Sequence, residues 1–410
     1  MPILTEETAK LPLPSFHTLR QVFDDGKIPD IRGAVTSAFL LSPIEKERLK
    51  GRKIALAVGS RGIKNLAEIV GATVDYLIAK GALPFIVPAM GSHGGATAAG
   101  QSAVLEGYGI SESTMGVPVA STMDTKRIAD TSGGLPIWFS SDALQADLII
   151  PIARIKPHTD FRGKVESGLC KMLAIGLGKH RGCSTLHKEG FQAFSHLIPD
   201  AAEKIIAHAP IAYGLAILEN AYDQTAYLEV VPANEFLSRE PALLRQAMAN
   251  MPRIIPEQID ILVIKEIGKD ISGAGMDPNI VGRTTKGILE GYRGPSVKRI
   301  VVLGVSKASK GNAIGIGLAD FTVKGMLPDI DYEATNANSI ASGNPEAARV
   351  PIAMDDEEDA IRASISCTPG IDPDQPRIVR IKNTLELETI EISEALVEEA
   401  RACPNLEFLP

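Results

Sequence analysis

Residues 147–158, DLIIPIARIKPH, contain the stretch that decides the fold. The apolar side chains run almost without a break from Leu148 to Ile155, whereas a strand with one wet face would alternate apolar and polar residues. A run of this kind is typical of a strand buried on both faces of a parallel sheet. It leads directly into Lys156-Pro157-His158, so titratable side chains follow the predicted strand.

Two earlier segments repeat the pattern of a strand, a polar turn and a helix. Residues 53–59, KIALAVG, predict a strand, and after Ser60-Arg61-Gly62 the periodic pattern of residues 65–81 predicts a helix that Gly81 closes. Residues 84–91, PFIVPAMG, predict the next strand, followed by a glycine-rich turn and a helix through Gln101 and Leu105. Strands that alternate with helices in this way indicate a parallel sheet.

The same signals continue to the end of the chain. Strands are predicted at residues 213–219 and 226–231 and a helix over residues 234–251, with a boundary near Met251-Pro252. Residues 259–266, IDILVIKE, and 299–305, RIVVLGV, again indicate buried parallel strands.

The length of 410 residues exceeds the size at which one hydrophobic core keeps growing. The length therefore predicts two domains, residues 1–253 and 254–410. Because predicted strands alternate with helices, the predicted fold class is α/β, with mainly parallel sheets in both domains. We expect an active-site cleft between the domains. The acidic run 355–359 is expected to begin a helix, because carboxylates favour a helix N-terminus. The stretch from Glu386 on is expected to be helical and to pack back on the first domain.

The composition excludes several classes of protein. A net charge of -8, 5% aromatic residues and a single tryptophan give neither the basic surface nor the stacking platforms that nucleic acid requires. The start, MPILTEETAKLPLPSF, has no basic segment followed by an apolar run, and no stretch has the length and apolarity of a membrane span. The four cysteines form no C-x-x-C pair, which suits a reducing compartment. We expect a cytoplasmic protein without nucleic-acid or membrane partners.

Three predicted strand ends deliver Arg61, His93 and His158. The carboxyl ends of parallel strands share one edge of a sheet, so these residues are expected to converge there. A guanidinium fork suits a carboxylate, and two imidazoles can exchange protons near neutral pH. Inverting a stereocentre needs a proton acceptor on each face, which makes this set typical of a racemase. The alternatives are ordinary loop histidines and a surface salt bridge of Arg61.

The segment 158–196 holds four of the seven histidines, together with Lys171 and Cys183. This clustering suggests a metal. A structural zinc is disfavoured, because Cys183 and His187 give one short ligand pair and no second pair has a suitable spacing. A metal hydrolase that uses His158, Cys183 and His187 stays open as an alternative.

Four motifs together resemble the nickel-pincer lactate racemase family. They are Gly-Ser-His at 91–93, Lys-Pro-His at 156–158, Ser-Gly-Leu-Cys-Lys at 167–171, and His187, which follows Lys171 by sixteen residues. The similarity extends over essentially the whole chain and is strongest from Lys53 to His196. It implies that Lys171 binds a pyridinium mononucleotide through a thioamide and that His187 ligates its nickel. The other nickel ligands would then be a carbon and two sulfurs of the nucleotide.

The resemblance also implies a reaction. His93 and His158 would be the alternating general bases, hydride would move to the cofactor, and the resulting planar 2-keto acid would accept hydride on either face. Gly94, Gly95 and Thr97, at the start of the helix that follows His93, are expected to contact the nucleotide phosphate. The expected partners are a small-molecule 2-hydroxy acid and the cofactor-biosynthesis accessory proteins, and a homo-oligomer is left open.

Departures from the family pattern point to a substrate other than lactate. Ser60 precedes Arg61 where the family's lactate enzymes have an acidic residue, and Gly94-Gly95 replaces a more usual Arg-Pro. In the second domain, Arg283 or Lys286 is expected to replace a substrate-contacting lysine. These differences leave open an alternative function, a nucleotide- or nickel-cofactor-binding protein without turnover.

Overall fold

The structure is a computed structural model that describes residues 4–60, 62–285, 291–292 and 294–410. The chain divides into two compact units, Asp24–Met251 and Met1–Phe23 with Pro252–Pro410. We name them by their main sheets: the first is the five-stranded unit and the second the eight-stranded unit. Among the described residues, no helix combines the length and the apolar character needed to cross a membrane.

The five-stranded unit is built on a mainly parallel sheet with the strand order β3-β2-β6-β7-β8. The strands are β2 (Lys53–Val58), β3 (Leu83–Pro88), β6 (Leu148–Arg154), β7 (Tyr213–Glu219) and β8 (Thr225–Pro232). The first four run parallel, and β8 joins β7 as an antiparallel edge. Strand β6 is in the middle of this sheet, which explains the long apolar run in its sequence.

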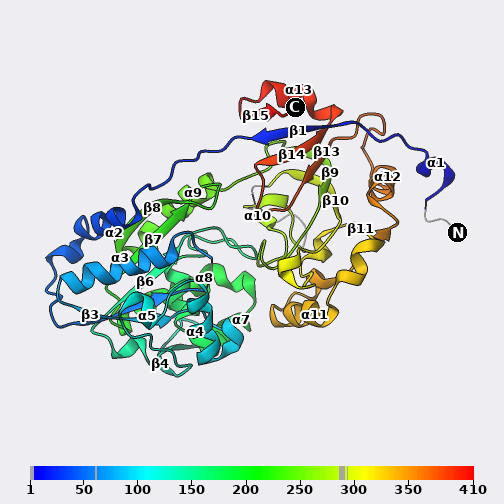
Figure 1. The fold of residues 1–410 in the computed structure, drawn as a ribbon. Helices are drawn as coiled ribbons and strands as arrows, with labels where there is room; N and C mark the ends of the chain where they lie inside the picture. Colours follow the sequence, from blue (N-terminus) through cyan, green and yellow to red (C-terminus); the bar gives the residue numbers. More distant parts are fainter. Residues whose placement is uncertain (1–3, 61, 286–290, 293) are drawn as a thin grey trace. The chain divides into compact units, whose positions relative to one another are not determined.

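Helices cover both faces of this sheet, and successive strand residues supply the two cores in turn. Ile54, Leu56 and Val58 pack into one core, whereas Ala55 and Ala57 belong to the other. On the first face, α2 (Ile31–Leu40) and α3 (Leu66–Ala79) lie side by side (Figure 1). On the second are α6 (Leu169–Lys171), α7 (Lys179–His187), α8 (Phe194–His208) and α9 (Phe236–Asn250). The remaining elements are α4 (Ala98–Gly107), α5 (Glu112–Met115), and the hairpin of β4 (Thr125–Asp130) and β5 (Pro136–Ser140).

The eight-stranded unit has the strand order β12-β11-β10-β9-β13-β14-β1-β15. Its parallel part consists of β9 (Gln258–Ile264), β10 (Ser296–Val302), β11 (Phe321–Val323), β12 (Ile352–Met354) and β13 (Ile378–Ile381). The antiparallel part consists of β14 (Thr389–Ser393), β1 (Phe16–Gln21) and β15 (Leu406–Phe408). Its helices are α1 (Glu6–Ala9), α10 (Pro278–Val281), α11 (Tyr332–Ala341), α12 (Glu357–Cys367) and α13 (Val397–Ala402). The predicted α/β class with mainly parallel sheets is confirmed.

Two expectations about the chain ends differ from the structure. The sequence predicts that the N-terminal segment belongs to the first domain, but β1 pairs with both β14 and β15 and so belongs to the eight-stranded unit. The stretch from Glu386 was expected to be helical, but it forms β14 before the six-residue helix α13, which packs against β15. The expectation for the acidic run is confirmed, because Asp356 caps α12 by accepting the N–H of Asp359.

Candidate active site

Three parallel strands of the five-stranded unit end at one edge and bring two of the predicted residues there. The loops after β3 and β6 carry His93 and His158. The loops after β2 and β3 meet directly, because Ser60 Oγ hydrogen-bonds His93 Nδ1. Arg61, the predicted carboxylate clamp, lies outside the described residues.

A buried hydrogen-bond network supports the loop that carries His93. Gln101, on α4, donates from Nε2 to the carbonyls of Gly91 at 2.9 Å and His93 at 3.4 Å. Its Oε1 accepts Lys179 Nζ at 3.1 Å, and the same ammonium group donates to Pro88 O at 2.7 Å. Lys179 is 0% exposed, and burial lowers its pKa to about 8. Lys179 therefore lies inside the unit and not on the basic surface that its charged neighbours suggest.

The residues predicted to contact phosphate follow His93. Gly94 (φ +66°) packs so closely on α4 that a Cβ would lie 2.5 Å from the carbonyl carbon of Gly100, whereas Gly95 (φ +63°) faces open space. Thr97 caps α4, since its Oγ1 accepts the N–H of Gly100 at 3.0 Å. The hydroxyl of Thr97 is thus used by the helix, and phosphate binding at this turn stays a prediction.

Glu166 organises the loop that presents His158. Its carboxylate accepts the backbone N–H of His158 at 2.6 Å and of Gly163 at 3.2 Å, and it pairs with Arg162 at 3.0 Å. The Glu166 side chain is 1% exposed, and burial raises its pKa against the opposing effect of Arg162. Nothing in the sequence marks Glu166 as part of this loop, because its role depends on contacts that form only on folding.

Asp160 gives the ring of His158 a partner for either tautomer. His158 Nδ1 accepts the Asp160 N–H at 3.0 Å and lies 3.5 Å from Asp160 Oδ2. The amide favours the form with the proton on Nε2, and the carboxylate favours the form with the proton on Nδ1. An imidazole with both partners is suited to giving and taking a proton at Nε2 in turn.

His187 ends α7, and its ring is oriented from within that helix. Nδ1 lies 2.7 Å from the carbonyl oxygen of Cys183, which assigns the ring proton to Nδ1 and leaves the lone pair on Nε2. Cys183 Sγ lies 3.4 Å from the same nitrogen. Burial by itself lowers the pKa of His187, but the contacts with Cys183 raise it above its usual range, while the charge of Lys171 acts in the opposite direction.

Lys171 ends the short helix α6 and precedes a π-helical turn over Met172–Gly176. Its Nζ lies 6.0 Å from the ring centroid of Phe161. Phe161 in turn lies 4.6 Å from the His158 ring, measured between centroids. The lysine, which influences the pKa of His187, therefore lies in the same region as both imidazoles.

Phenylalanine side chains join His158 to His187. Phe191 lies between the two imidazoles, with centroid distances of 5.7 Å to His158 and 5.4 Å to His187. Phe194, which is fully buried, contacts His187 at 4.9 Å and Phe191 at 5.3 Å. These apolar rings reduce the access of water to the imidazoles, a feature that the histidine pattern alone does not reveal.

The loop of His93 also touches the helix of His187. Ser92 Oγ lies 3.8 Å from Cys183 Sγ, and Gly91 packs against the same side chain. The structure thus brings His93, His158, Lys171 and His187 to one region of the five-stranded unit. No group of three or more His, Cys, Asp or Glu side chains in the described chain could hold a metal ion, so His158, Cys183 and His187 do not form the hydrolase site considered as an alternative.

The predicted substrate contacts of the second domain, Arg283 and Lys286, stay predictions. Arg283 forms an ion pair with Asp320 at 2.6 Å, and it also donates to the carbonyls of Leu318, Val297 and Lys298. These bonds tie strand ends and loops of the eight-stranded unit together. Lys286 lies outside the described residues.

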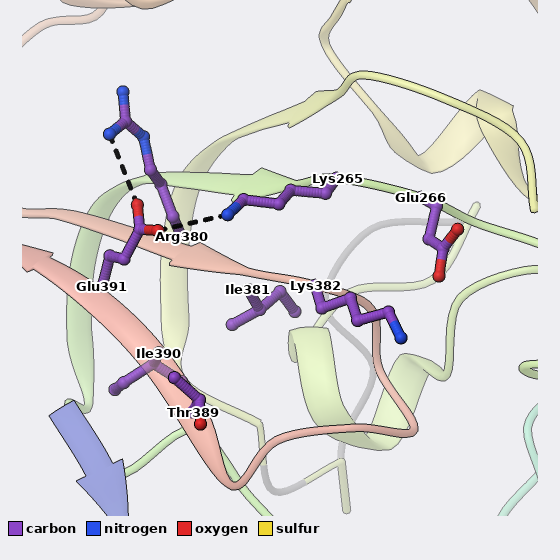
Figure 2. A pocket seen from close by; sticks show the side chains of 8 residues that line it. All are labelled: Lys265, Glu266, Arg380, Ile381, Lys382, Thr389, Ile390 and Glu391. Atoms are coloured by element: carbon purple, nitrogen blue, oxygen red, sulfur yellow. Dashed lines mark hydrogen bonds and ion pairs between the residues drawn. The ribbon is translucent and has the colours of Figure 1, made fainter. Parts of the chain in front are cut away.

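A pocket of about 460 Å³ lies where β9 and β13 end beside β14 in the eight-stranded unit (Figure 2). Its cations are engaged in ion pairs: Lys265 and Arg380 with Glu391, and Lys382 with Glu386. None of the predicted site residues lines it. The pocket is a salt-bridged surface groove and offers no set of groups for catalysis.

Comparisons with known proteins place the fold. No family model matches the chain, and no curated protein matches it. Among solved structures, the chain is similar to the lactate racemase apoprotein from Thermoanaerobacterium thermosaccharolyticum, with a TM-score of 0.52, 12% sequence identity, and coverage of 91% of this chain and 99% of that one. A Thermotoga maritima protein matches with a TM-score of 0.47, 13% identity and 84% coverage of each chain. The first likeness shows that the chain has a lactate-racemase-like fold.

Proposed function

We propose that the protein is a racemase or epimerase of a 2-hydroxy acid that carries a nickel-pincer nucleotide on Lys171. The observation that carries the proposal is the gathering of His93, His158, Lys171 and His187 in one region of the five-stranded unit, where the loop of His93 contacts Cys183. The lactate-racemase-like fold supports the class of reaction. The departures at Ser60 and Gly94-Gly95 favour a substrate other than lactate.

The residues present fit such a group. The bond from His187 Nδ1 to the Cys183 carbonyl is the arrangement that orients a ligating imidazole, with Nε2 left as the donor atom. One imidazole is all that the resemblance requires of the protein, since the other ligands would come from the nucleotide. Lys171, which lies near enough to influence His187, would supply the amine for covalent attachment.

The protein's own groups would handle the protons of the reaction. The bound nucleotide would supply a hydride acceptor, so that no second negative charge develops beside the substrate carboxylate. One histidine would accept the hydroxyl proton, and the other, already protonated, would donate its own proton to the keto oxygen when hydride returns on the opposite face. The Asp160 contacts of His158 and the Ser60 contact of His93 would keep both rings oriented.

The test is inversion of single enantiomers of 2-hydroxy acids by protein coexpressed with the cofactor-making accessory proteins. His93→Ala and His158→Ala should keep the nucleotide and lose at least about 100-fold in inversion rate, the scale of general acid–base catalysis. His208→Ala is the matched control, because this exposed ring bonds only its own helix at Lys204 O among the described residues. Inversion at the wild-type rate in both variants would contradict the proposal.

The same experiment distinguishes the proposed enzyme from the alternative, a cofactor-binding protein without turnover. That function predicts nucleotide on Lys171 but a stable optical rotation for every acid in the panel. Loss of rotation with any one of them supports the enzyme.

A further inference from the structure

Glu240 is a buried carboxyl that none of the roles assigned so far explains. It belongs to α9, is 1% exposed, and accepts the backbone N–H of Cys170 on Oε2 at 2.9 Å. The Cys170 thiol also hydrogen-bonds this carboxyl. Within the described chain, Oε1 has no hydrogen-bond partner. A carboxyl with an unsatisfied buried oxygen is costly to fold, which sets Glu240 apart from the surface carboxylates of the chain.

The position of Glu240 explains the glycine of the Ser-Gly-Leu-Cys-Lys motif. A Cβ on Gly168 would collide with Glu240 Oε1. The φ of Gly168 is 171°, which is extended backbone open to any residue, so glycine is required here for space alone. Leu169 and Cys170 are both 0% exposed, which leaves the carboxyl in direct contact with the backbone of the turn.

The Cys170 amide that Glu240 binds belongs to the residue directly before Lys171. Fixing this peptide fixes the start of the lysine side chain. The amine end of Lys171 lies on the side of Phe161 and His187, so a small rotation of the turn would move it relative to both.

We propose that Glu240 is a positioning residue that holds the Gly168–Lys171 turn in the conformation in which Lys171 receives its nucleotide. The inference rests on the proposed function of Lys171. Glu240 acts through the backbone of the turn and takes no part in the reaction itself.

The contact between Glu240 and the Gly168–Lys171 turn should depend on pH. Burial raises the pKa of Glu240 to about 7, and the Cys170 amide, the Cys170 thiol and the Leu169 amide limit the rise. When the turn opens, the carboxyl meets water and its pKa returns toward the ordinary value of 4.5. The closed turn therefore binds more protons than the open one, and opening becomes easier as the pH rises from about 4.5 to 7. The change in the opening equilibrium is on the order of a hundredfold, since each pKa unit is a factor of ten.

Amide hydrogen exchange of the whole protein tests whether Glu240 holds the Gly168–Lys171 turn closed. Peptides that cover residues 168–172 are compared with peptides of β6 at pH 5 to 8, after correction for the intrinsic pH dependence of exchange. Wild type should lose protection of the turn as the pH rises, while E240Q, whose amide is neutral and still accepts the Cys170 N–H, should be independent of pH. E240A should exchange at least about tenfold faster in the turn. E229Q is the control, since Glu229 binds Arg239, the neighbour of Glu240 in α9.

The rate of the mass increment on Lys171 is the second readout. E240A should acquire the nucleotide at least about tenfold more slowly than wild type or E229Q, and E240Q should recover most of the rate. If protection of the turn against hydrogen exchange has the same pH dependence in wild type and E240Q, the inference is wrong, even if E240A fails to fold. Equal attachment rates in wild type and E240A overturn it too, with the proposed function intact. If wild type never acquires the nucleotide but shows the predicted hydrogen exchange, the proposed function is wrong. The role of Glu240 in holding the Gly168–Lys171 turn is then still supported.

Discussion

The ammonium group of Lys179 illustrates what burial does to a single residue. Two oxygens, Pro88 O and Gln101 Oε1, hold the group inside the five-stranded unit, and burial lowers its pKa from 10.5 to about 8. Between these two values the unfolded chain binds more protons than the folded chain. We therefore expect stability to increase as the pH rises from 8 to 10.5.

Urea unfolding of wild type and Lys179→Met at pH 8 and pH 10 measures this effect. The gain in wild type is at most ~3 kcal/mol, and Lys179→Met should show none of it, because the titrating group is gone. Lys126→Met is the control, since Lys126 is exposed on β4. An equal pH dependence in wild type and Lys179→Met would contradict the buried position of this cation.

Sequence reasoning found the residues that follow strands and missed the residues that support them. His93 and His158 could be predicted because the ends of parallel strands share an edge. Lys179 could not, because its partners Pro88 and Gln101 are distant in the sequence. Gln101 and Glu166 lie within ten residues of the loops that they hold, but no sequence pattern distinguishes their buried side chains from solvated ones.

At the scale of elements, the stability of the turn between β3 and α4 should depend more on Gly94 than on Gly95. Gly94→Ala should cost more than about 3 kcal/mol, because it adds a collision with Gly100 to the strain of a positive φ. Gly95→Ala should cost only about 1–2 kcal/mol, since the same strain arises in open space. Chemical denaturation of both variants measures the difference, and equal costs would refute the close approach.

The buried strands could be predicted from their apolar runs, but the last 25 residues could not be assigned from their charge. Acidic residues there suggested a helix, yet Ile390 and Ile392 alternate with polar neighbours and face the core as part of β14. The period of two was present in the sequence. Periodicity of this kind says more about local structure than an acidic composition does.

At the scale of the whole molecule, the N-terminal segment supports the unit formed by the far end of the chain. Leu19 of β1 and Leu56 of β2 are both 0% exposed, one in each unit. Leu19→Ala and Leu56→Ala should each cost about 2–5 kcal/mol. In hydrogen exchange, Leu19→Ala should weaken β13 and β14, and Leu56→Ala should weaken β3 and β6. A Leu19→Ala effect confined to β3 and β6 would contradict the strand order.

The account depends most of all on Lys171, and peptide-mapped mass spectrometry of protein coexpressed with the cofactor-making proteins tests it most directly. We predict a nucleotide-sized mass increment on Lys171 in wild type and in His187→Ala, none in Lys171→Ala, and nickel retained in wild type alone. An unmodified Lys171 in protein that nevertheless inverts a 2-hydroxy acid would contradict the account.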